Sequence, residues 1–231
     1  MRPPLRNRRL AWAAALAVLA AVVLFGVFPG CYLARLGCGQ WRVASGQRPV
    51  EEVLADPATP ETARRSLRLI EEARRFGVDV LGMEAGDSYT TFYDTGGRPV
   101  MYNVTASRAD RLEPVTWWFP VTGSVAYKGY FSVEDARRER DYLEQIGYDA
   151  LLSAVSAYST LGWTSDPVLS TFVLLPELQL ADLLFHELAH RQLFAPGDTE
   201  FNEAFAAAVA REGVRRWLET QGRDADLAVY L

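Results

Sequence analysis

The chain contains only two histidines, His186 and His190, which lie four residues apart with Glu187 beside the first. Residues four apart share one face of a helix, so both imidazoles would point the same way with Cβ atoms about 5–6 Å apart. Two such imidazoles can hold one Zn²⁺ ion at about 2.0–2.1 Å each. Glu187 would lie about 100° further round the helix, where it borders the ion without ligating it. The spacing therefore predicts a zinc site with Glu187 as the general base for the attacking water.

The third ligand must come from outside this HExxH motif, because a catalytic zinc ion needs three protein ligands and one open position. No histidine remains, which leaves a carboxylate or, less favourably, a tyrosine or a cysteine. Twelve residues separate His190 from Glu203, which lies on a second predicted helix after the Pro196-Gly197 break. That spacer is long enough for the second helix to double back and face the histidines. The predicted ligands of the Zn²⁺ ion are therefore His186, His190 and Glu203.

The sequence leaves two alternatives to this ligand set, namely a different carboxylate or an HExxH pattern that holds no metal. Asp198 and Glu200 are rival ligands at the turn, although Asp198 fits better as the N-cap of the second helix. An HExxH pattern also occurs by chance on helices whose histidines are solvated or bonded within the core. Here the apolar residues around the motif, the lack of any other histidine and the carboxylate on the next helix favour a metal. Small residues beside Glu203 also favour a close approach of the two helices: Ala204, Ala206, Ala207 and Ala208.

An α+β order of elements must position these side chains. Residues 49–76 have a helical pattern interrupted by prolines, and residues 88–131 have a strand pattern with glycine turns. Gly96-Gly97 lies between two strand-like runs and predicts a hairpin. A helix follows the capping box Ser132–Asp135, and two more helices fill the last third of the chain. We expect one domain over residues 31–231, with helices around a small antiparallel sheet.

Residues 1–30 are expected to form a separate signal or membrane anchor. Four arginines and no acid stand in residues 1–9, and residues 10–28 are 19 positions without a charge. About 20 apolar residues span a bilayer as a helix, whereas the apolar part of a secretory signal has roughly 7–15. Since arginines favour the cytoplasmic side, we expect a transmembrane helix that holds the domain on the far, extracytoplasmic side.

Cys31 offers a different tether. Gly30-Cys31 after an apolar run is similar to a bacterial lipoprotein cleavage site, although Phe28 and Pro29 fit that pattern poorly. A lipid on Cys31 would leave Cys38 alone, whereas two free cysteines outside the cytoplasm can pair. A third interpretation, a buried core helix, is disfavoured by the flanking arginines and by the length of the apolar run.

The charge of the chain argues against nucleic acid as a partner. The formal net charge is −5, and without the four N-terminal arginines the rest of the chain stands at −9. Phosphate binding needs clustered Lys and Arg on one face.

Two segments resemble the gluzincin metallopeptidases: HELAH at residues 186–190 and NEAFA at residues 202–206. Aminopeptidases of the aminopeptidase N type carry a similar NEGFA segment after a longer spacer, and its glutamate is the third zinc ligand, which implies that role for Glu203. Further segments resemble a bacterial family of predicted membrane-attached aminopeptidases, many of which look like lipoproteins: WWFPVTGSVAYKGYF, AYSTLGW, DPVLSTF, FHELAHRQLF and GDTEFNEAFA. The resemblance implies a zincin-like metallopeptidase fold, a Zn²⁺ cofactor, a peptide substrate, attachment to a bacterial membrane and a further C-terminal helical part.

The chain departs from the resemblance at Ala207. Thermolysin-like enzymes place an acid at this position, four residues after the ligand glutamate, to orient a zinc histidine. The group that orients the ligands must therefore come from elsewhere. A zinc peptidase also needs a donor for the oxyanion, and without a spare histidine a tyrosine or arginine must serve. The candidates are Tyr158, Tyr130 and Tyr127, although each also suits ordinary packing.

These residues predict a membrane-tethered, zinc-dependent metallopeptidase that removes N-terminal residues from peptides. An aminopeptidase needs an acid that binds the substrate's α-amine, and the candidates are Glu177, Asp166 and Asp198. An endopeptidase of membrane or envelope proteins is the first rival. A non-catalytic, zinc-stabilised envelope scaffold is the second, and Glu187 argues against it, because a structural site fills all four positions and needs no general base.

Overall fold

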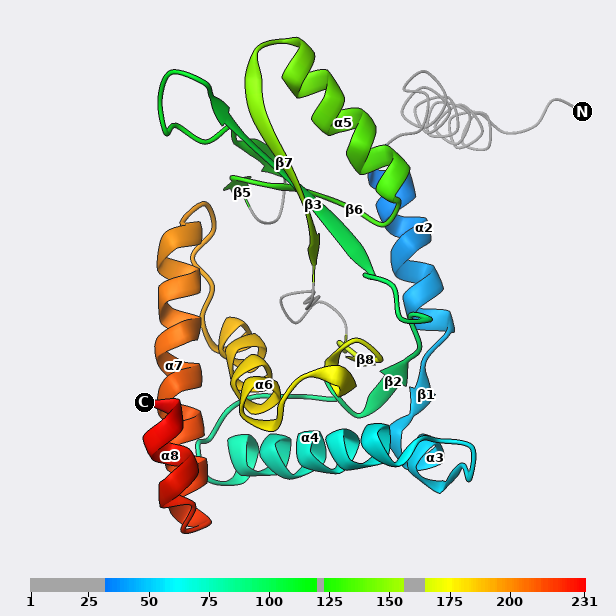
Figure 1. The fold of residues 1–231 in the computed structure, drawn as a ribbon, viewed down its shortest axis with the longest axis vertical. Helices are drawn as coiled ribbons and strands as arrows, with labels where there is room; N and C mark the ends of the chain where they lie inside the picture. Colours follow the sequence, from blue (N-terminus) through cyan, green and yellow to red (C-terminus); the bar gives the residue numbers. More distant parts are fainter. Residues whose placement is uncertain (1–31, 120–122, 156–164) are drawn as a thin grey trace, which may run out of the picture. The chain divides into compact units, whose positions relative to one another are not determined.

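A computed structural model describes three stretches of the chain, residues 32–119, 123–155 and 165–231 (Figure 1). The chain divides into two compact units, residues 1–45 and 46–231. In the first unit the structure describes α2 (Tyr32–Ser45). The predicted anchor at residues 10–28 and Cys31 lie outside the described residues. Among the residues that are described, no helix is both long and apolar enough to cross a membrane.

The second unit has the predicted α+β composition. Its helices are α3 (Val50–Ala55), α4 (Glu61–Asp79), α5 (Val133–Gln145), α6 (Glu177–Gln192), α7 (Thr199–Thr220), α8 (Asp224–Tyr230) and the short 3-10 helix η2 (Phe172–Leu174). Its strands are β1 (Arg48–Pro49), β2 (Thr91–Tyr93), β3 (Met101–Arg108), β4 (Trp117–Phe119), β5 (Gly123–Val125), β6 (Lys128–Tyr130), β7 (Tyr148–Val155) and β8 (Val168–Leu169).

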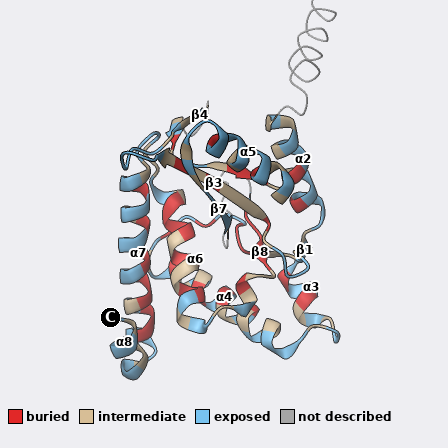
Figure 2. Cartoon of the chain, turned by 45° about the horizontal axis from the view of Figure 1, so that its top comes forward, coloured by how far each residue is buried: buried red, intermediate tan, exposed pale blue. Residues whose placement is uncertain are grey.

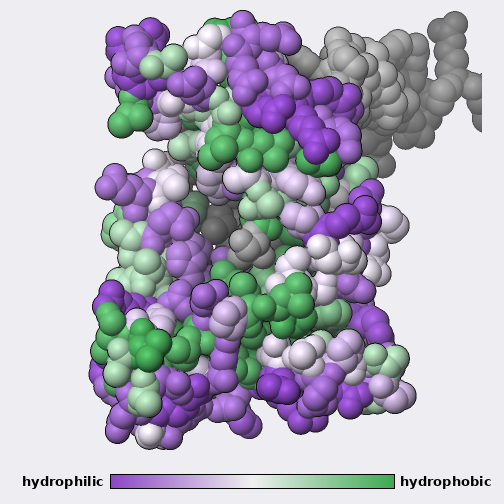
Figure 3. Space-filling model, in the orientation of Figure 1, coloured by the Kyte–Doolittle hydropathy of each residue, from purple (hydrophilic) through white to green (hydrophobic). Residues whose placement is uncertain are grey.

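The predicted small antiparallel sheet is present in the order β6-β3-β7. Strands β3 and β7 pair along their full eight residues, and β6 pairs with the other edge of β3. Helix α5 packs on this sheet, and its outer surface is hydrophilic (Figure 3, purple). The predicted cap of α5 is confirmed, because the Ser132 hydroxyl accepts a hydrogen bond from Asp135 N at 3.3 Å.

The predicted hairpin at Gly96-Gly97 is wrong. Strand β2 before the two glycines pairs with β1 and, in parallel, with β8, whereas β3 after them pairs with β6 and β7. Both glycines do turn the chain, with φ of 64° and 73°. A turn signal fixes the local backbone, but the partner of a strand depends on long-range register.

The core of the helical part forms where α4, α6 and α7 pack on one another (Figure 2, red). Phe185 of α6 is fully buried at its centre. A Cβ added at Gly213 of α7 would lie 3.1 Å from the Phe185 ring, and one added at Gly77 of α4 would lie 3.3 Å from it. Phe76 contacts the same ring edge-on, with 6.3 Å between ring centroids. Two glycines therefore let the neighbouring helices close on Phe185 from two directions.

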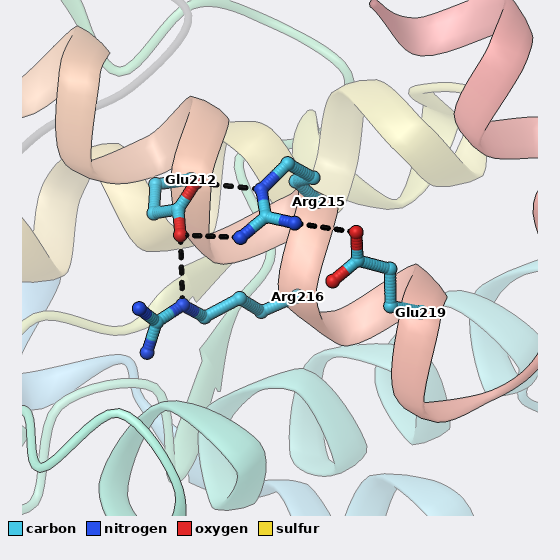
Figure 4. Close-up of polar contacts among 4 residues, drawn as sticks. All are labelled: Glu212, Arg215, Arg216 and Glu219. Carbon is cyan, nitrogen blue, oxygen red and sulfur yellow. Dashed lines mark hydrogen bonds and ion pairs between the residues drawn. The ribbon is translucent and has the colours of Figure 1, made fainter.

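The outer face of α7 is charged and opposite in character to its buried face. Arg215 and Arg216 both donate to Glu212, with shortest N–O distances of 2.6 and 2.8 Å, and Arg215 also pairs with Glu219 (Figure 4). The hydrogen bonds from Arg215 and Arg216 lower the pKa of Glu212 to about 2. Because such exposed pairs are worth little, the burial of α7 against α6 must hold the helix in place.

Substitution of Gly213 tests the packing around Phe185. We expect Gly213→Ala to destabilise the fold by roughly 1 kcal/mol, because overpacking costs about 1–3 kcal/mol and exceeds the gain of about 1 kcal/mol in helix propensity. Gly37→Ala in α2 is the matched control, since nothing lies within 4 Å of its added Cβ. Thermal unfolding of both full-length variants measures the effect, and an equal rise in melting temperature for both would contradict the packing argument.

Candidate metal centre

Helix α6 presents both histidines to the start of α7. Leu180, Leu184 and Leu188 on the same helix are buried in the core. The His190 side chain is 8% exposed and that of His186 is 23% exposed. The HExxH motif therefore lies at the border between the core and the solvent.

The three predicted ligands converge. The Nε2 atoms of His186 and His190 are 3.2 Å apart. One carboxylate oxygen of Glu203 lies 3.2 Å from His186 Nε2, and the other lies 3.7 Å from His190 Nε2. Among the described residues, this is the one group of three or more metal-ligating side chains whose ligand atoms lie within 4.8 Å of one another.

The spacing of these atoms fits a tetrahedral zinc ion. Ligands at about 2.0–2.1 Å from Zn²⁺ in tetrahedral geometry are separated from each other by about 3.3 Å. His186 Nε2 lies 3.2 Å from His190 Nε2 and 3.2 Å from one oxygen of Glu203, whereas His190 Nε2 lies 3.7 Å from the other oxygen. If Glu203 ligates an ion through one oxygen, its carboxylate must turn that oxygen toward both nitrogens. Three ligands leave a fourth tetrahedral position, and Glu203, with a side chain 58% exposed, lies on the solvent side.

Asn202 fixes the turn that brings Glu203 to the histidines. Its buried side-chain amide accepts a hydrogen bond from Ala195 N and donates one to Ala195 O, both at 2.8 Å. Asp198 caps α7 as predicted, accepting from Phe201 N at 3.0 Å. These three hydrogen bonds close the connection between α6 and α7 and fix the first turn of α7, and Glu203 follows in the next turn.

The alanines around Glu203 do not all act as the sequence suggested. Ala206 is fully buried against α6, but Ala204, Ala207 and Ala208 are exposed. The buried face of α7 continues instead through Ala210 and Gly213. The close approach of the two helices therefore rests on positions spaced by three or four residues, as helical periodicity requires.

The charges of the three groups are coupled. The hydrogen bond to Glu203 raises the pKa of His186, while burial lowers the pKa of His190. The same hydrogen bond from His186 lowers the pKa of Glu203. At neutral pH Glu203 is therefore ionised and His190 is neutral, and these are the forms that ligate a metal. The raised pKa of His186 favours its protonated form, which competes with metal binding.

Glu187 and Tyr127 lie near the three groups, whereas Tyr130 has other neighbours. Glu187 is buried, at 8% exposed. Tyr127, which follows β5, is 40% exposed, and burial together with the charges of Glu203 and Glu187 raises its pKa. Tyr130 is buried on β6, with Lys128 over its ring at 5.7 Å. Tyr158 lies outside the described residues.

A loop that the sequence did not single out contacts Arg191, the residue that follows the HExxH motif. The Ser88 hydroxyl accepts hydrogen bonds from Arg191 and from Asp166 N, both at 3.0 Å. Tyr89 is buried with φ of 66°, an unusual backbone for a bulky residue. Its pKa is raised well above the ordinary value by burial and then by the charge of Glu187. No local pattern marks these residues, because their contacts join segments about 80–100 positions apart.

The three acids proposed to bind the α-amine of a substrate are engaged in other interactions or are buried. Glu177 forms an ion pair with Arg223. Asp198 is the cap of α7, and Asp166 is fully buried. Glu200, a rival metal ligand, is exposed and does not join the group formed by the histidines and Glu203.

A comparison with protein families shows to which family the chain belongs. The family model described as "Putative aminopeptidase" matches residues 31–230, which is most of the chain. The chain belongs to this family. Membership indicates a peptidase that acts on peptide substrates. No curated protein and no solved structure matches the chain. Within this family member, the group formed by His186, His190 and Glu203 is the candidate metal centre.

Removal of one ligand tests the centre. We expect His190→Ala and Glu203→Gln to lose stoichiometric zinc, because a site reduced to two good ligands binds far more weakly. Glu200→Gln is the matched control on the same helix and should keep one zinc per chain. Elemental analysis after dialysis measures the metal, and a full equivalent of zinc in either ligand variant would show that the assignment is wrong.

Proposed function

We propose that the chain is a zinc-dependent metallopeptidase. The observation that carries the proposal is the convergence of two imidazole Nε2 atoms and the Glu203 carboxylate at separations of 3.2–3.7 Å. Zn²⁺ bound there would polarise the scissile carbonyl and lower the pKa of water toward about 7. The exposed Glu203 supports a catalytic centre over a closed structural one, since a structural site shields all four ligands.

Glu187 is the proposed general base. It adjoins His186 in the chain but lies on a different side of the helix, so its carboxylate can take the proton of the attacking water while the histidines hold the metal. The same carboxyl group can then deliver that proton to the leaving amine. Its low exposure limits competition from bulk water for this proton.

Tyr127 is the described tyrosine best suited to stabilise the oxyanion. It is partly exposed, and burial followed by the charges of Glu203 and Glu187 raises its pKa, which supports a hydroxyl close to the centre. Because its pKa is raised, the phenol stays protonated at neutral pH and can donate. Tyr130 is less suitable because it is buried. Tyr158 keeps its place as the alternative suggested by the sequence.

Membership of the family supports an aminopeptidase. An endopeptidase is the second candidate, because it needs no acid to bind a substrate α-amine. Of the three acids that could serve an aminopeptidase in this way, Glu177 and Asp198 have structural partners and Asp166 is buried. A choice between the two requires a substrate with and without a free α-amine.

The two candidates can be separated with one peptide prepared in two forms, with a free and with an acetylated N-terminus. We expect the zinc-loaded protein to cleave the free form at its first bond and to leave the acetylated form intact. Zinc-loaded Glu187→Gln should be slower by several orders of magnitude, because the amide cannot accept the proton. Equal cleavage of both forms would favour the endopeptidase, and retained activity in Glu187→Gln would refute the mechanism.

We also propose that the peptidase domain lies outside the cytoplasm of a bacterium, tethered by residues 10–28 or by a lipid on Cys31. Four arginines before the apolar run support this orientation. Mass spectrometry of the membrane-extracted protein separates the two tethers, since a lipoprotein loses residues 1–30. Protease added to intact spheroplasts should digest the domain. Protection of the domain while a periplasmic control is degraded would reverse the orientation.

A further inference from the structure

His190 lies in the last turn of α6, which ends at Gln192. The end of a helix opens more easily than its middle, because its last carbonyls have no partners within the helix. Many helices close with a glycine in left-handed backbone, but Leu193, which follows α6, is extended with φ of −151° and ψ of 131°. A metal ligand in this turn therefore depends on support from outside the helix.

The side chain of Gln192 joins this turn to the loop of residues 84–88, which lies between α4 and β2. Its amide nitrogen donates to Leu188 O in the helix and to Glu84 O in the loop, and its amide oxygen accepts from Glu84 N, all at 2.9 Å. One side chain thus connects the turn that carries His190 to both main-chain polar atoms of Glu84. Because Gln192 is exposed, water competes for these hydrogen bonds, and a second anchor matters.

Arg191 provides that second anchor to the same loop. Its Nη1 donates to the hydroxyl of Ser88 at 3.0 Å, and Ser88 is fully buried. Gly86 makes room for the guanidinium, because a Cβ added there would lie 3.1 Å from Arg191 Nη2. The loop is itself held by α4, since Arg74 Nε donates to Ser88 O at 2.7 Å. The two residues that follow His190 are therefore both tied to a loop that is bonded to another helix.

We propose that the 84–88 loop clamps the last turn of α6, and that Gln192 and Ser88 are positioning residues for the metal ligand His190. Without the clamp, this turn opens in a larger fraction of molecules, and the apparent affinity for a metal falls with the fraction that is competent to bind. The inference rests on the proposed zinc centre. A purely structural role would instead lower the stability of the whole fold and leave the zinc affinity of the folded protein unchanged.

Zinc affinity of the full chain, measured by competition with a chromophoric chelator, tests the clamp from both sides. Gln192→Met keeps the length of the side chain and its neutral charge but removes all three hydrogen bonds. Ser88→Ala removes, from the loop side, the hydroxyl that Arg191 contacts. We expect each variant to bind zinc roughly 3- to 10-fold more weakly, because the last turn is then open in most molecules.

Gln221→Met is the matched control. Gln221 follows the last turn of α7, and its side chain donates a hydrogen bond to Glu72 of α4, so it also ties the end of one helix to a neighbouring element. The last turn of α7 carries no proposed ligand, since Glu203 lies near the other end of that helix. This variant should bind zinc like the wild type.

Amide hydrogen exchange of the zinc-free protein provides a second readout that does not depend on the metal. Loss of the clamp should speed exchange in the last turn of α6 and leave the middle of α7 unchanged, whereas a purely structural role would speed exchange in both. Wild-type zinc affinity in Gln192→Met would overturn the inference even if Ser88→Ala fails to fold, because Gln192 is exposed and its replacement leaves the core intact. If the wild type binds no zinc, the proposed function fails instead, and unchanged exchange in the last turn of Gln192→Met would then overturn the clamp separately.

Discussion

The position of helix α6 depends on the buried ring of Phe185, which packs closely against Gly77 of α4 and Gly213 of α7. Phe185 immediately precedes His186, so the position of this ring sets the direction in which the HExxH face points. A helix turns about 100° per residue, and a modest rotation would aim the imidazoles away from α7. A side chain at either glycine would crowd the ring, so this close packing of α6 depends on both glycines.

The second constraint is the connection between α6 and α7. The side-chain amide of Asn202 forms hydrogen bonds with the main-chain N and O atoms of Ala195, and Asp198 caps α7. These hydrogen bonds fix the turn before α7 and the start of the helix that carries Glu203. Metal sites depend on such support, since ligand positions must hold to within about 0.5 Å. The NEAFA segment thus contributes a structural residue, Asn202, next to the proposed ligand.

Local patterns predicted helices α3 to α7, the Ser132 and Asp198 caps and the grouping of His186, His190 and Glu203, because each depends on helical periodicity or on neighbouring residues. Helices α2 and α8 were not predicted. The Gly96-Gly97 hairpin failed because β2 and β3 find partners elsewhere in the chain. The Ser88–Arg191 contact has no local signal, since it joins segments brought together only by the packing of the core. The roles of Gly77 and Gly213 were likewise hidden, because a helical glycine ordinarily signals only a weaker helix.

The central claim is that two imidazoles and one carboxylate bind zinc through the geometry of α6 and α7. X-ray absorption at the zinc edge of the zinc-loaded full chain tests it most directly, because the metal reports its own ligands. The account predicts a shell of nitrogen and oxygen at about 2.0–2.1 Å with the outer-shell signals of two imidazoles. A sulfur shell at about 2.3 Å, or an oxygen shell without imidazole signals, would contradict it.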